Sequence, residues 1–204
     1  MTYLILHGSF GSPEENWFPW LKLKLEEEGY RVYLPRLPVN DFESFKPENE
    51  LIQNLKSWLY TVHPIVEEII ESADDLTIIA HSISPAFVLS LMQAETELKI
   101  KKLIAVAPFL HQGKASKIWQ IKKVNDSFLK AVEKIISDPI NINTIKSRIS
   151  ETIVMCGSND PYVNLSESIE YSELLNAKLI KIKDGGHLNA EAGYTEFQEI
   201  LNLI

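Results

Sequence analysis

The sequence predicts an α/β fold in which a mostly parallel sheet of six strands lies between two layers of helices. Short apolar runs alternate with longer segments of helical character, which is the order of elements in a doubly wound sheet. Most of the runs are apolar at consecutive positions, as in "LTIIAH", and this indicates strands buried on both faces. With 204 residues, of which 45% are hydrophobic, the chain is long enough for one well-buried domain, and we expect residues 1–204 to form it.

Each expected strand is a short run rich in β-branched and aromatic residues. These strands cover residues 3–7, 30–34, 76–81, 102–107, 152–156 and 178–182. The segments between them predict helices at about 14–28, 48–73, 84–96, 125–137, 164–176 and 190–203. In such sheets ligands bind at the carboxyl ends of the strands, so the residues that follow each strand are the first candidates for a site.

Two connections are long enough to form the rim of a site. Residues 35–49 carry three prolines and are expected to be an extended loop. Residues 108–150 are long for a crossover and contain helical pieces, so they are a candidate cap or rim segment. Four lysines of this segment surround Trp119 and are interpreted as a solvated face without a functional role. They are Lys114, Lys117, Lys122 and Lys123.

Composition excludes some classes of partner. The chain has 28 acidic and 20 basic residues and a net charge of −8, which argues against nucleic acid and favours a small neutral or cationic substrate. No apolar stretch reaches the about 18 residues that a membrane span needs. The single cysteine, Cys156, lies in an apolar run, is expected to be an inert core residue, and permits no intrachain disulfide. We therefore expect a cytoplasmic protein that does not associate with membranes.

Ser82 follows the third expected strand, and Pro85 marks the start of the next helix. A serine on a sharp strand-to-helix turn can be a nucleophile, usually within G-x-S-x-G, because small residues must flank the strained backbone. Here Ala80 and Ser84 occupy the glycine positions. Both are small, and glycine at position 84 is expected to be tolerated. From this stretch alone, a helix cap remains an equal alternative for Ser82.

Polar residues at the ends of two further strands favour the interpretation of Ser82 as a nucleophile. Asp160 lies on the loop that leaves the fifth strand, and His187 comes just after the sixth. A serine nucleophile needs a base that takes its proton and a carboxylate that orients the base. Asp184 is the competing carboxylate, but it lies so close to His187 in sequence that we expect it to support the turn.

The loop after the first strand, "HGSFG", is a candidate for stabilising negative charge. An oxyanion hole needs two N–H donors aimed at the oxygen on which charge develops. We predict the backbone N–H groups of Ser9 and of Ile83, the residue after Ser82, with Phe10 as the alternative to Ser9.

Taken together, "LHGSFGSPEENW", "IIAHSIS", "VAPF", "GSNDPYV" and "DGGHLNAEAGY" resemble the small serine hydrolases named for retinoblastoma-binding protein 9, a compact branch of the α/β-hydrolases. The resemblance covers nearly the whole chain. It implies an α/β-hydrolase sheet of order 2-1-3-4-5-6, with Ser82 as nucleophile, Asp160 as acid and His187 as base. The difference lies at Ser84, where relatives usually have glycine.

The expected reaction is hydrolysis of a small carboxylic ester, with an amide as the less favoured substrate, through an acyl-enzyme on Ser82, which is carboxylesterase-like chemistry. No cofactor or metal is expected, since neither His63 nor His111 has ligand partners at zinc-site spacing. The alternative is a partner-binding protein on the same fold with little or no catalysis, although no protein partner is indicated. His7 and His81 are expected to be structural.

Three aromatic residues follow the loop after the first strand and are expected to belong to the core, with the wall of a pocket as the alternative. They are Trp17, Phe18 and Trp20.

Overall fold

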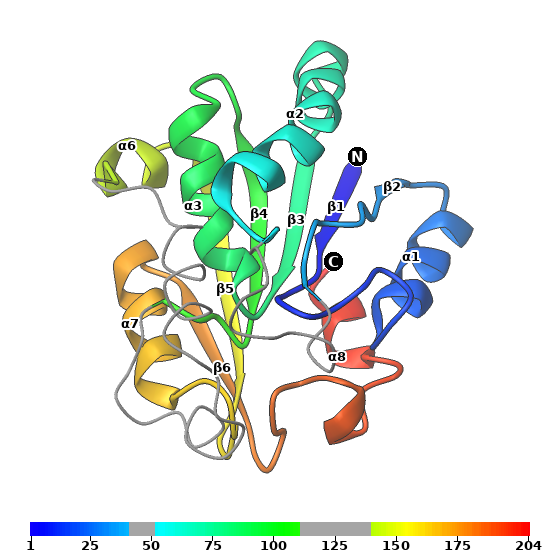
Figure 1. The fold of residues 1–204 in the computed structure, drawn as a ribbon, viewed down its shortest axis with the longest axis vertical. Coiled ribbons are helices and arrows are strands. Elements are labelled where there is room, and N and C mark those ends of the chain that lie inside the picture. Colours follow the sequence, from blue (N-terminus) through cyan, green and yellow to red (C-terminus); the bar gives the residue numbers. More distant parts are fainter. Residues whose placement is uncertain (41–51, 111–139) are drawn as a thin grey trace.

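The computed structural model describes residues 1–40, 52–110 and 140–204 and contains one six-stranded sheet (Figure 1). Its order is β2-β1-β3-β4-β5-β6, and every neighbouring pair is parallel. The strands are β1 (Thr2–Leu6), β2 (Arg31–Tyr33), β3 (Leu76–His81), β4 (Ile100–Val106), β5 (Ile149–Gly157) and β6 (Lys178–Ile182). The predicted fold class and strand order are confirmed.

Helices follow the strands on both faces of the sheet. They are α1 (Phe18–Glu27), α2 (Leu55–Ser72), α3 (Ser84–Ala94), α6 (Ile142–Lys146), α7 (Leu165–Leu175), the short 3₁₀ helix η1 (Ala190–Ala192) and α8 (Gln198–Leu201). The helix predicted at 125–137 and the four lysines around Trp119 lie outside the described residues. So does most of the candidate rim segment, of which α6 is a described part.

Three helix predictions differ from the structure for local reasons. Of the helix predicted at 48–73, residues 52–54 are not helical and α2 begins at Leu55, because Asn54 has an extended backbone and its side chain caps the helix. The segment predicted to begin at residue 14 becomes helical only at Phe18, because Asn16 takes a left-handed backbone angle (φ 55°) before Pro19 starts the helix. The single helix predicted over 190–203 is wrong. Gly193 adopts φ 93° and ends η1, so the chain turns before α8 begins.

Each face of the sheet has its own hydrophobic core, because neighbouring side chains along a strand point to opposite faces. Leu4 and Leu6 face one core with α2, α3, α6 and α7, whereas Tyr3 and Ile5 face the other with α1 and α8. In the view of Figure 1, α2 and α3 lie in front of the sheet. In β1 and β3, where every residue is buried, burial on both faces explains the apolar residues at consecutive positions.

The parallel order places the carboxyl ends of all the strands at one edge of the sheet. The loops after β1, β3, β5 and β6 therefore meet there, although more than 170 residues separate the first from the last. These loops carry the predicted site residues.

Candidate active site

Ser82 lies on a strained turn between β3 and α3. Its φ is 62°, a left-handed value that is uncommon for a residue with a side chain. Neighbouring backbone holds the turn in place: the Ser82 N–H donates to the Val106 carbonyl (2.9 Å), and the Phe109 N–H donates to the Ser82 carbonyl (2.8 Å). Ile83 is the N-cap of α3, and no side chain caps that helix. The helix-cap interpretation of Ser82 is therefore wrong.

The loops after β5 and β6 bring an imidazole and a carboxylate to Ser82. His187 Nε2 lies 3.2 Å from Ser82 Oγ, and His187 Nδ1 lies 2.7 Å from Asp160 Oδ2. The other carboxylate oxygen of Asp160 accepts the N–H groups of Tyr162 (2.8 Å) and Val163 (3.0 Å). The side chains of His187 and Asp160 are only 8% and 4% exposed, so this chain of contacts is largely shielded from water.

The partners determine which ring nitrogen of His187 carries the proton. A carboxylate only accepts hydrogen bonds, so Nδ1 donates to Asp160 and keeps its hydrogen. In the neutral ring, Nε2 then has a free lone pair that faces the Ser82 hydroxyl. This is the protonation state that a general base requires.

Asp184 is not part of this chain of contacts. It is exposed, has φ 55°, and its backbone N–H donates to Ser158 Oγ (3.0 Å), which is the expected role in the turn. Within the described residues, no contact joins its carboxylate to His187. Of the two candidates, only Asp160 meets the imidazole.

Contacts that the sequence did not predict hold the loop after β5 against the loop after β6. The Gly186 N–H donates to Asn159 Oδ1 (2.8 Å). Gly157 packs so closely against the same loop that an added Cβ would lie 2.1 Å from the Gly186 carbonyl oxygen. The run "GSND" signals a turn, but sequence alone does not show that its amide side chain reaches the other loop.

His81 and Trp17 support the backbone next to His187. His81 Nε2 donates to the His187 carbonyl oxygen (2.9 Å), and the two imidazole rings lie 4.7 Å apart. Burial, with a smaller contribution from His187, lowers the pKa of His81 to about 3, so its ring is neutral. Trp17 Nε1 donates to the Leu188 carbonyl oxygen (2.9 Å). Trp17 and Phe18 are fully buried, which confirms the core interpretation for both, and Trp20 packs against the same core.

The loop after β1 lies against the turn that carries Ser82. A Cβ added to Gly8 would lie 2.7 Å from the Cβ of Ser82, so only glycine fits this approach. The Gly11 N–H donates to the Gly8 carbonyl (3.3 Å) across a turn in which Phe10 has φ 57°. Across the described residues, the N–H groups of Ser9 and Ile83 donate to no other protein atom.

A model of the serine hydrolase family matches residues 3–204. The chain belongs to the serine hydrolase family. It is 21% identical over 201 residues to YdeN of Bacillus subtilis (strain 168), covering 98% of this chain and 92% of that protein. At 21% identity, this serine hydrolase and YdeN are distant relatives.

Solved structures agree with this fold. The structure of the ydeN gene product from B. subtilis superposes with a TM-score of 0.75 at 19% identity, covering 99% of this chain and 95% of that one. The 2-hydroxy-6-oxo-6-phenylhexa-2,4-dienoate hydrolase from Rhodococcus sp. strain RHA1 gives 0.66 at 17%, covering 99% and 88%. Est1E from Butyrivibrio proteoclasticus gives 0.63 at 18%, covering 99% and 84%. These neighbours support an α/β-hydrolase fold.

Outside the site around Ser82, the described part of the chain holds a few further titratable groups. Residues 1–40, 52–110 and 140–204 contain no group of three or more His, Cys, Asp or Glu residues that could hold a metal ion. His63 is about half exposed and pairs with Glu95 (2.7 Å) and Glu67 (3.2 Å). Cys156 is buried, and burial raises the pKa of its thiol.

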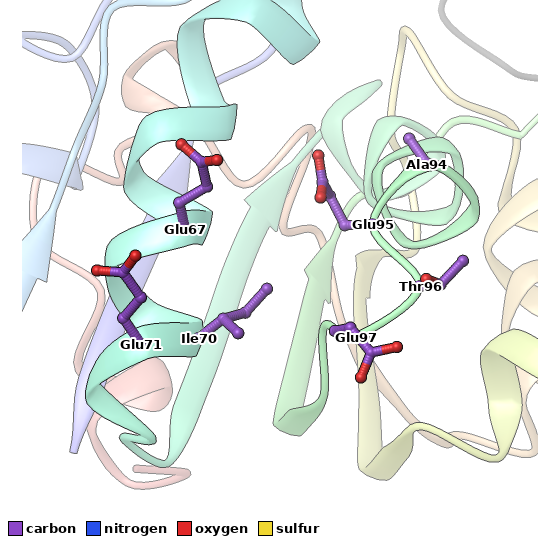
Figure 2. Close-up of a pocket in the computed structure, with 7 residues that line it drawn as sticks. All are labelled: Glu67, Ile70, Glu71, Ala94, Glu95, Thr96 and Glu97. Carbon is purple, nitrogen blue, oxygen red and sulfur yellow. The ribbon is translucent and has the colours of Figure 1, made fainter.

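A hollow of about 270 Å³ lies between α2 and the segment that follows α3 (Figure 2). Four glutamates, an isoleucine and two small residues line it: Glu67, Ile70, Glu71, Ala94, Glu95, Thr96 and Glu97. The hollow lies at the carboxyl end of α3, whereas Ser82 precedes its first turn, so the length of this 11-residue helix separates them.

No helix in the described parts of the chain has the length and apolar character needed to cross a membrane.

Proposed function

We propose that this serine hydrolase cleaves small carboxylic esters, with amides as the less favoured substrates, through an acyl-enzyme on Ser82. The observation that carries the proposal is the continuous set of contacts from Ser82 Oγ to His187 (3.2 Å) and from His187 to Asp160 (2.7 Å), next to a strained serine. Nucleophile, base and orienting carboxylate are the three groups that acyl transfer by serine requires.

In the first half of the reaction, Ser82 Oγ attacks the carbonyl carbon of the ester and its proton moves to His187 Nε2. The carbonyl oxygen becomes an oxyanion in a tetrahedral intermediate. When the intermediate collapses, the bond to the leaving alcohol breaks and His187 gives its proton to that alcohol. In the second half, water attacks the acyl carbon, His187 takes the water proton, and the acid leaves as the proton returns to Ser82.

Asp160 stabilises the imidazolium that exists during both halves. Its carboxylate faces Nδ1 with little exposure to water, so the attraction is only weakly screened. The backbone N–H groups of Ser9 and Ile83 are the proposed donors to the oxyanion. Their lack of protein acceptors within the described residues supports this role.

The proposal includes several statements about the whole protein. We infer a single domain over residues 1–204, and membership of the branch named for retinoblastoma-binding protein 9, on the motifs around Ser82, Asp160 and His187. The net charge of −8 favours neutral or cationic substrates over nucleic acid or other polyanions. The proposed chemistry needs no cofactor and no metal, and a reducing cytoplasm suits a chain with one buried thiol.

A fluorophosphonate probe tests the proposal. The serine oxygen attacks phosphorus, fluoride leaves, and the proton passes to His187, so intact protein should gain one adduct on the peptide that contains Ser82. The Ser82→Ala protein should gain none and should not hydrolyse p-nitrophenyl butyrate, and heat-denatured wild-type protein serves as the control for non-specific labelling. Equal labelling of Ser82→Ala and wild type would refute the assignment. Absence of both labelling and turnover in folded wild-type protein would favour the partner-binding alternative.

A further inference from the structure

Ser84 connects the turn that carries Ser82 to the loop formed by residues 7–11, called here the oxyanion loop. Its hydroxyl donates a hydrogen bond to the His7 carbonyl oxygen. Both residues are completely buried, so water does not replace this contact. The glycine that the strict G-x-S-x-G motif has at this position offers no side-chain donor.

The bond to His7 acts on the backbone of the oxyanion loop. A peptide unit is planar, so a fixed carbonyl also fixes the direction of the N–H in the same unit. Ser84 holds the His7 carbonyl and thereby orients the peptide that joins His7 to Gly8. Gly8 lies directly against Ser82, since a Cβ added to it would lie 2.7 Å from the Ser82 Cβ.

The imidazole of His7 holds the next peptide. The Leu37 N–H donates to His7 Nε2 (3.0 Å), so the proton of the neutral ring is on Nδ1, which donates to the Gly8 carbonyl (2.9 Å). Burial lowers the pKa of His7, which keeps the ring neutral. Because the Gly8 carbonyl and the Ser9 N–H belong to one planar unit, fixing the carbonyl fixes the direction of that N–H.

We propose that Ser84 is a positioning residue for the oxyanion hole: its hydroxyl anchors His7, and His7 in turn orients the Ser9 N–H. The inference rests on the proposed function of Ser82 and gives Ser84 a role that a glycine does not perform. It also changes the expectation drawn from sequence alone. Glycine at position 84 fits the turn but releases the loop, so it lowers activity.

The test compares Ser84→Ala and Ser84→Gly with wild type and with Ser90→Ala. Ser90 is also a completely buried serine of α3, so its variant controls for the loss of a buried hydroxyl from the same helix. Two readouts are measured on each folded protein: the second-order rate of fluorophosphonate labelling, and the inhibition constant of an aryl trifluoromethyl ketone. The ketone forms a tetrahedral adduct with serine, and its oxyanion occupies the oxyanion hole.

Removing one oxyanion donor lowers kcat by about 10²–10³-fold. A donor that is present but misplaced should lower kcat by a smaller factor. We expect both Ser84 variants to label about 10–100-fold more slowly and to bind the ketone more weakly by a similar factor. Ser90→Ala should stay within about twofold of wild type in both. The glycine variant keeps the test decisive if the alanine variant does not fold, since glycine suits the turn.

Three results would overturn the inference. Folded Ser84 variants that label and bind the ketone like wild type, with only a lower thermal midpoint, would give Ser84 a structural role alone. Slower labelling with unchanged ketone affinity would place the effect on Ser82 rather than on the loop. If Ser90→Ala lost as much labelling rate and ketone affinity, the effect would come from removing any buried hydroxyl of α3 and not from the bond between Ser84 and His7. In all three, labelling at Ser82 would still support the proposed function, which fails only if Ser82→Ala labels like wild type.

Discussion

Replacing Asp160 with asparagine should almost abolish ester hydrolysis while leaving the fold intact. In the wild-type protein one carboxylate oxygen accepts the N–H groups of Tyr162 and Val163, and the other accepts Nδ1–H of His187. The amide oxygen of asparagine must take over the two backbone donors, since its NH₂ group has no lone pair for them. The NH₂ group then faces His187 Nδ1.

That exchange reverses the tautomer of His187. Nδ1 must accept from the amide, so the proton moves to Nε2, which can no longer take the proton of Ser82. Where this substitution has been made in a Ser-His-Asp triad, kcat falls about 10⁴-fold, or about 5 kcal/mol at 1.36 kcal/mol per factor of ten. The loss of a charge-assisted hydrogen bond should lower the free energy of unfolding by about 1–2 kcal/mol.

Initial rates with p-nitrophenyl butyrate and urea unfolding measure the two effects. Asp184→Asn is the matched control, because Asp184 is exposed and asparagine tolerates its left-handed φ of 55°. We expect this control to keep kcat within about twofold of wild type. A larger loss in Asp184→Asn than in Asp160→Asn would mean that the wrong carboxylate has been assigned, and a loss below tenfold in Asp160→Asn would refute the tautomer argument.

Two further predictions concern the surroundings of Ser82. Gly8→Ala should slow fluorophosphonate labelling more than 100-fold. The added Cβ would lie 2.7 Å from the Cβ of Ser82, so either the loop or the turn must move. If this variant were labelled as fast as wild type, the loop would be able to move aside without affecting Ser82. The free energy of unfolding should fall by about 2 kcal/mol between pH 7 and pH 5, because His81 has a folded pKa of about 3 and takes up its proton near pH 6.5 only when unfolded. Below that pH the unfolded state binds the additional proton, so acid destabilises the fold, and His7, whose pKa is also lowered, acts in the same direction. Urea unfolding at the two pH values measures this, and a difference that His81→Gln leaves unchanged would exclude His81 as its source.

The chain's hydrophobic pattern was sufficient to predict the strands and the fold class. In β1 and β3 every residue is buried, so most consecutive positions are apolar whatever the details of packing. Helix boundaries were less predictable where one residue adopts a left-handed angle. Gly193 ends η1 within a segment whose pattern suits a longer helix, because the turn depends on the backbone rather than on hydrophobic spacing.

By itself, the sequence determined that the candidate site residues lie at the carboxyl ends of the strands. Ser82, Asp160 and His187 each follow a strand, and parallel strands bring such residues to one edge. The tertiary structure decided between the alternatives that sequence left open. It placed Asp160 rather than Asp184 against the imidazole, and gave Ser82 a strained turn rather than a helix cap. It also placed Ser84 on the His7 carbonyl. These outcomes depend on side-chain directions and on distances between loops far apart in the chain, and no local pattern encodes either of them.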